Sequence, residues 1–171
     1  MLLLWYCYLM YNFPEHVVAF KKYLDKGGDG KDKNHSVIER ALDTVFSRHY
    51  RLSQVTETNH NLRCFCCNKT LSFDTSQCGH IVPRNFKAIR YCFDNVKIQC
   101  QVCNVHQREW GKLLMVAKMS QTEDGRKHID GLIKRVSPDQ QSQNIISKEK
   151  MVYLFKHHYG SASNLYSLLG Y

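Results

Sequence analysis

Apolar residues recur at helical spacing near both ends of the chain, and the segment between them lacks that period. Pro14 opens an apolar run over 14–24, and Gly27 and Gly28 follow its end, as helices favour. This pattern predicts a first helix. Ser36 and Glu39 fit a capping box that opens a second helix. Its expected buried stripe is Ile38, Ala41, Leu42, Val45 and Phe46.

Helical patterning returns from Trp110, where Leu113, Leu114, Val116 and Ala117 are expected to pack. Further helices are predicted over 126–136 and 147–158, with a short last helix over 161–169. The dipeptides 124–125 and 137–138 are the predicted breaks. Residues 51–62 form a polar connector. Three segments are therefore expected: N-terminal helices over 1–62, a short-stranded module over 63–119 and C-terminal helices over 120–171.

The composition changes this picture mainly through charge. The chain is 43% hydrophobic, which is typical of a globular protein, and carries a formal net charge of +9. Such a charge attracts polyanions, so nucleic acid is the first partner to consider. The apolar opening over 1–10 has neither a basic start nor a cleavage site, and it is too short to span a membrane. We therefore expect no signal peptide and a cytoplasmic location.

The cysteines indicate metal binding rather than disulfides. Seven of the eight fall between positions 64 and 103, where Cys64 and Cys67 form one C-x-x-C pair and Cys100 and Cys103 another. Four thiolates complete the tetrahedral shell of a structural zinc ion. Cys66 lies between the first two, so Cys66 or Cys78 stays open as a replacement ligand. The 32 residues between the pairs exceed the usual spacing, which indicates an insertion.

The insertion carries a recognisable signature. It contains Gly79-His80-Ile81-Val82-Pro83-Arg84, then a strand that begins at Asp94-Asn95-Val96, and it leads into Cys103-Asn104-Val105-His106. These motifs resemble the HNH (ββα-metal) nucleases, and more narrowly the phage NinG or Rap recombination nucleases that act on branched DNA. The resemblance covers about 45 residues strongly and the first 60 not at all. It implies an α+β fold, in which a zinc-stapled ββα-metal module is embedded in a mostly helical chain.

Each signature residue has a chemical task in this interpretation. His80 is suited to take a proton from water, because imidazole titrates near neutral pH. Asn104 and His106 are candidate ligands of a catalytic Mg²⁺ or Mn²⁺. The resemblance implies that Asn95 hydrogen-bonds the loop and keeps His80 in position.

One departure from the family pattern affects the metal. Many HNH nucleases have an aspartate directly before the base histidine, but here Gly79 stands there. The catalytic metal would then depend on Asn104, His106, water and the substrate phosphate, unless Asp74 or Asp94 approaches from elsewhere. We expect weak metal binding without substrate.

Basic residues accompany the signature. The segment 64–119 holds eight Lys and Arg residues against three acids. The expected DNA contacts, which position phosphates without reading sequence, come from Arg84, Lys87, Arg90, Arg108 and Lys112. Junction-cutting enzymes often act as dimers, so the apolar segment 2–13 is a candidate surface for a homodimer.

The favoured function is thus a DNA endonuclease, structure-selective for branched substrates such as Holliday junctions and active in the host cytoplasm if phage-encoded. The alternative is a non-catalytic zinc module that binds DNA or a protein partner. A nuclease directed at RNA is a third hypothesis.

Overall fold

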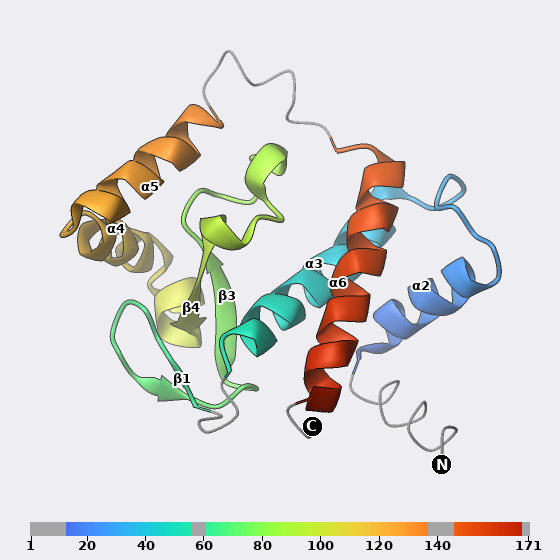
Figure 1. Cartoon of the computed structure of the whole chain (residues 1–171), viewed down its shortest axis with the longest axis horizontal. Coiled ribbons are helices and arrows are strands. Elements are labelled where there is room, and N and C mark those ends of the chain that lie inside the picture. The colour runs from blue at the N-terminus through green and yellow to red at the C-terminus, as the bar shows by residue number, and fades with distance from the viewer. Residues whose placement is uncertain (1–12, 56–60, 137–145, 169–171) are drawn as a thin grey trace. The chain divides into compact units, whose positions relative to one another are not determined.

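The computed structural model describes residues 13–55, 61–136 and 146–168 and divides into two compact units (Figure 1). The described part of the first unit is 13–49 with 147–168, and that of the second is 50–55 with 61–136 and 146. The fold class is α+β, as expected. Among the described residues, no helix has both the length and the apolar character needed to cross a bilayer.

The first unit is built from helices α2 (Glu15–Asp25), α3 (His35–Ser53) and α6 (Lys148–Leu168), although the last turn of α3 belongs to the second unit. The predicted stripe of α3 is entirely buried. The capping-box prediction is wrong, because the carbonyl of Asn34 accepts the N–H groups of Val37 and Ile38 and the helix begins at His35, before Ser36.

Helix α6 is continuous where two helices were predicted. Its buried side includes Met151 and Phe155, and Phe155 packs edge-on against Phe20 of α2 at a centroid distance of 4.9 Å. Gly160 does not interrupt the helix. A glycine inside a helix costs only about 1 kcal/mol relative to alanine, which packing of the rest of the helix offsets.

The second unit contains two antiparallel two-stranded sheets. Strand β1 (Leu62–Arg63) pairs with β2 (Thr70–Leu71). Strand β3 (Ser76–His80) pairs with β4 (Val96–Cys100), and His80 lies opposite Val96. The loop between β3 and β4 includes the short 3-10 helices η1 (Lys87–Ile89) and η2 (Phe93–Asn95). Tyr50 donates a hydrogen bond to the carbonyl of Val96 over 2.9 Å and so ties the end of α3 to β4.

Helices follow β4 directly. The π-helix η3 (Val102–His106) leads into α4 (Arg108–Met119), and α5 (Glu123–Lys134) follows (Figure 1). The predicted packing side of α4 is wrong: Gly111, Met115 and Met119 are buried, whereas Leu113 is 59% exposed. Trp110, Leu114 and Val116 are also exposed.

The predicted break at 124–125 is also wrong. Thr122 caps α5, since its side-chain oxygen accepts the N–H of Gly125 over 3.1 Å. Glu123 and Asp124 then lie in the first turn, where negative charge is favoured by the helix dipole. The three expected segments therefore correspond to two units, because α6 packs with the N-terminal helices while α4 and α5 stay with the strands.

Candidate metal centre and catalytic cleft

The first cysteine pair lies on a tight turn between β1 and β2. Cys64 donates its N–H to the carbonyl of Lys69, and its own carbonyl accepts the N–H of Asn68, each over 2.9 Å. Asn68 has a φ of +63°, a left-handed conformation that asparagine tolerates better than most residues. This turn presents Cys64 and Cys67 together.

The second pair lies where β4 ends and η3 begins. Cys100 is the last residue of β4, and Cys103 lies within the π-helix. The two pairs are joined through the backbone, because the N–H of Phe65 donates to the carbonyl of Ile98 over 2.8 Å. The turn between β1 and β2 is thereby attached to the β3–β4 hairpin.

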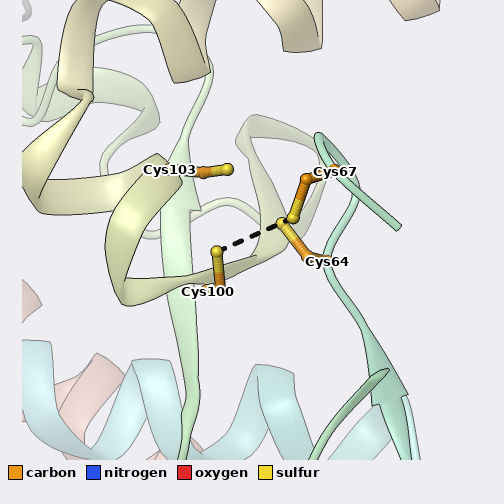
Figure 2. A group of neighbouring side chains, drawn as sticks. All are labelled: Cys64, Cys67, Cys100 and Cys103. Carbon is orange, nitrogen blue, oxygen red and sulfur yellow. Dashed lines mark hydrogen bonds between the residues drawn. The ribbon is translucent and has the colours of Figure 1, made fainter. Parts of the chain in front are cut away.

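The four thiols form one cluster (Figure 2). Their sulfur atoms all lie within 4.8 Å of one another, and those of Cys67 and Cys100 are 3.8 Å apart. Four sulfurs bound tetrahedrally to zinc at about 2.3 Å would lie about 3.8 Å apart. The cluster can therefore hold a metal ion such as zinc, as the spacing of the cysteines predicts.

The electrostatics of Cys64 suit a metal-binding thiolate. Burial raises its pKa, but backbone N–H groups of Cys67, Cys100 and Cys66 aimed at its sulfur lower it more, to about 7. A thiol with that pKa is readily deprotonated, and the thiolate is the form that binds zinc.

The two alternative ligands lie outside the cluster. The thiol of Cys66 donates to the carbonyl of Gly111 over 3.2 Å and accepts a hydrogen bond from Nε2 of Gln99 over 2.9 Å. Burial raises the pKa of this thiol and so favours its protonated form. Cys78 lies on β3 and lines a separate cleft.

That cleft brings together two of the four predicted catalytic residues, His80 and Asn104. It has a volume of about 240 Å³ and lies among β3, the loop after β3, β4, η3 and α4. Its lining residues are Cys78, His80, Pro83, Arg84, Gln99, Asn104, Val105, Arg108 and Lys112. No carboxylate is among these described lining residues, whereas three of them are cationic.

His80 is held by a defined hydrogen bond. Its Nε2 lies 2.9 Å from the carbonyl oxygen of Arg90, which can only accept. Nε2 of the neutral ring therefore carries the proton, and the basic lone pair is on Nδ1. The bond thus fixes the tautomer of the neutral ring.

Asn95 secures the loop that supplies this carbonyl. It is fully buried, and its Oδ1 accepts the N–H of Val82 over 2.8 Å. Its Nδ2 donates to the carbonyls of Val82 and Ile89 over 3.1 and 3.2 Å. These bonds fix the two ends of the segment between His80 and Arg90.

Asn104 is oriented by a neighbour on β3. Its Nδ2 donates to Oε1 of Gln77 over 2.7 Å, so the amide oxygen Oδ1 is the atom left to act as a metal ligand. Of the two predicted metal ligands, Asn104 lines the cleft. His106 is exposed and is not among the lining residues.

Neither aspartate that could have supplied a carboxylate lies at the cleft. Asp94 pairs with Arg135 of α5 over 2.6 Å. Asp74 lines a different pocket, beside the cysteine cluster.

Three of the five predicted DNA contacts line the cleft and two do not. Arg84, Arg108 and Lys112 line the cleft. Arg90 is only 7% exposed, and its guanidinium lies 3.4 Å from the carbonyl of Arg84, so its prediction as a phosphate contact needs correction. Lys87 is half-buried and lies off the cleft lining.

Two glutamines were not anticipated from the sequence. Gln77 orients Asn104, and Gln99, which is 2% exposed, lines the cleft while it contacts Cys66. The one signal for Gln99 is Gly79: a Cβ there would lie 1.7 Å from Oε1 of Gln99, so the glutamine needs the space that glycine leaves. No comparable signal points to Gln77.

Comparison of the chain with protein-family models, with curated proteins and with solved structures finds no match.

Proposed function

We propose that this chain is a metal-dependent DNA endonuclease of the HNH (ββα-metal) class. One observation carries the proposal: the cleft gathers His80, Asn104 and three cationic side chains at the junction of an antiparallel hairpin and the helices that follow it. A histidine base, a metal ligand and phosphate-binding cations are the groups that phosphodiester hydrolysis uses. The order strand, strand, helix agrees with the resemblance in the sequence.

His80 is the proposed general base. The Nε2–H group donates a hydrogen bond to the carbonyl of Arg90, so the lone pair of the neutral ring is on Nδ1. Nδ1 can take a proton from a water molecule as that water attacks phosphorus. The imidazolium that forms keeps the same hydrogen bond to the carbonyl, so the charged ring stays in place. His80 then releases the proton that it took from water, either to solvent or to the departing 3′-oxygen.

Asn104 is the proposed ligand of the catalytic cation, through Oδ1. Oxygen ligands suit Mg²⁺ and Mn²⁺, and such an ion would neutralise the charge that develops on the phosphate and the departing 3′-oxygen. Since no carboxylate is among the described lining residues, the protein alone offers few ligands. Metal and DNA would therefore bind together, because phosphate oxygens would have to supply further ligands.

Arg84, Arg108 and Lys112 are the proposed contacts to the DNA backbone. They line the cleft from the loop after β3 and from α4. Cations that share the cleft with the proposed general base can hold the phosphate without reading sequence. A preference for branched DNA, such as a recombination intermediate, rests on the resemblance to phage recombination nucleases.

The test is cleavage of labelled linear, nicked, flapped and four-way DNA by the purified chain with Mg²⁺ or Mn²⁺. We expect cutting that depends on the added cation, and replacement of His80 by Ala should slow it at least about 100-fold. Binding of the same DNA without cleavage should persist in the His80→Ala variant. Matched RNA substrates show whether DNA is the preferred polymer.

Two controls sharpen the result. His35→Ala removes an exposed histidine from the start of α3, in the other unit, and should cut like the parent. A reaction with added chelator removes the catalytic cation, and the zinc content of the treated protein shows whether the ion in the cysteine cluster was lost as well. Equal cleavage by the parent and His80→Ala proteins would exclude the proposed base.

A non-catalytic zinc module that binds a protein partner is the second candidate. It is favoured by the exposed apolar side chains of α4, since Trp110 is 62% and Leu113 is 59% exposed. In that case the purified chain cuts none of the four DNA forms with either cation, whereas replacing Trp110 and Leu113 by Ser abolishes partner binding.

A further inference from the structure

A group of three histidines lies in the first unit and shares no residue with the cysteine cluster or the cleft. His49 is in α3, and His157 and His158 are adjacent in α6. One ring nitrogen of each lies within 4.8 Å of the others. The fold thus brings His49 into contact with His158, which lies 109 positions later in the sequence.

The distances suit a shared metal ion. The Nδ1 atoms of His49 and His158 are 2.9 Å apart. Two imidazole nitrogens bound to one ion at about 2.0 to 2.1 Å lie about 2.9 to 3.4 Å apart for bond angles between 90° and the tetrahedral value. The ring of His157 lies close to the other two: its centroid is 6.1 Å from that of His49 and 5.1 Å from that of His158.

The surroundings favour neutral rings. His158 is 5% exposed and packs edge-on against Phe46 with the ring centroids 5.1 Å apart. Burial, with the nearby His49 and His157, lowers the pKa of His158 to about 3, and burial lowers the pKa of His49 as well. Neutral imidazole is the form that binds metal ions. His157 is exposed, so an ion has a path from solvent to the group.

We propose that His49, His157 and His158 form a second metal site, which takes a divalent transition ion of the zinc class. Three nitrogen donors suit zinc, copper or nickel, and not Mg²⁺ or Ca²⁺, which require oxygen ligands. The bound ion links α6 to α3 within the first unit. Its fourth position is filled by water, as three-histidine zinc sites commonly have.

The test is calorimetric titration of Zn²⁺ into the full chain that already carries zinc in its cysteine cluster. The parent is compared with His157→Ala, which removes an exposed ligand with little risk to folding, and with His35→Ala as a histidine control on α3. The cysteine cluster and the cleft are the same in all three proteins. We expect the parent and His35→Ala to bind one more Zn²⁺ per chain than His157→Ala, or to bind it at least tenfold more tightly.

A second variant and a second readout keep the result clear. His49→Gln removes the ligand on the other helix and should lose the same ion, while circular dichroism confirms that its helices persist. Added Zn²⁺ should raise the melting temperature of the parent and not that of either ligand variant. Equal Zn²⁺ stoichiometry and affinity in the parent and His157→Ala would show a hydrogen-bonded histidine pair only and overturn the proposal.

Discussion

At the scale of single residues, Asn95 illustrates how the loop around the cleft is held. All three hydrogen bonds of its side chain go to backbone groups of the segment after β3, and the side chain is fully buried. The sequence suggests this residue through the HNH resemblance alone. Its partners, Val82 and Ile89, become known only when the loop is folded.

Replacing Asn95 by Ala should destabilise the second unit by several kcal/mol. The N–H of Val82 and the carbonyls of Val82 and Ile89 would lose their partner, and each buried unsatisfied group costs about 1 to 3 kcal/mol. Its neighbour gives a matched control, because Asp94→Ala removes a partly exposed ion pair worth less than about 1 kcal/mol. Denaturant unfolding measures both; equal losses of stability would contradict the role given to Asn95.

Gln77 and Asn104 should affect cleavage in different ways. Asn104→Ala removes the proposed ligand and should lower the maximal rate at least about 100-fold. Gln77→Ala removes only the group that orients Asn104, so we expect a higher Mn²⁺ concentration for half-maximal cleavage and a smaller change in the maximal rate. Titrations with Mn²⁺ separate the two effects. An unchanged Mn²⁺ dependence in Gln77→Ala would show that the hydrogen bond does not position the ligand.

The limits of sequence reasoning at this scale are clear from His106 and Arg90. The spacing places His80 and Asn104 beside the same hairpin, because a strand and the helix start after it have regular geometry. His106 follows three residues after Cys103, inside a π-helix whose wider turn changes where each side chain points. Arg90 is basic and close in sequence, yet its guanidinium is buried in its own loop.

At the scale of elements, Gly111 sets how α4 packs. A Cβ at this position would lie 2.0 Å from the carbonyl oxygen of Cys103, so the start of α4 approaches η3 as closely as glycine allows. The apolar pattern of 113–117 does not contain this information. This explains why the side of α4 predicted to be buried is largely exposed.

Gly111→Ala should therefore be destabilising by about 1 to 3 kcal/mol, although alanine is the better helix former. Gly131 of α5 is the control, since a Cβ there meets no atom within 4 Å. Gly131→Ala should stabilise the protein by about 0.5 to 1 kcal/mol. Melting temperatures that rise for both variants would contradict the close contact between α4 and η3.

The cysteine cluster joins elements that have few other contacts, and its ligands can be tested by metal content. Cys100→Ser should lose the bound zinc and unfold the β1–β2 turn together with the end of β4, because these short strands depend on the ion for stability. Cys66→Ser should retain one zinc ion in the cluster, since that thiol contacts Gln99 and Gly111 instead. Zinc measured by atomic emission distinguishes the two. Loss of zinc in Cys66→Ser would assign Cys66 to the metal shell.

The helices illustrate what periodicity can and cannot predict. The stripe of α3 was predictable because five apolar residues recur on one side of a long helix, and all are buried. The start of α3 was not predictable from the pattern, since Asn34 rather than Ser36 supplies the carbonyl that accepts the first N–H groups of the helix. The start of α5 was missed because Asp124 and Gly125 resemble a turn, yet Thr122 makes them the first turn of a helix.

At the scale of the whole molecule, the order of segments in the sequence differs from their grouping in space. Helix α6 joins the N-terminal helices, whereas α4 and α5 belong with the strands. Sequence patterns describe local structure, so they do not show which distant helices pack together. Of the segment 2–13, the candidate surface for a homodimer, residues 2–12 lie outside the described residues and Phe13 is 5% exposed. The dimer stays a prediction.

The charge of the chain belongs to this scale too. A net charge of +9 favours association with polyanions, and under the proposed function the convergence of Arg84, Arg108 and Lys112 on the cleft would direct a phosphate toward His80. Nucleic acid as the partner stays a prediction from composition, whereas the folded chain shows which cations share the cleft.

The most direct test of the proposed nuclease function is the rate of cleavage of four-way and linear DNA by the zinc-loaded chain with Mn²⁺, measured beside His80→Ala. This function predicts cation-dependent cutting by the parent and a loss of at least about 100-fold in the variant, with its fold and DNA binding retained. Equal rates in the two proteins, or no cutting by the parent on any of these substrates, would contradict it.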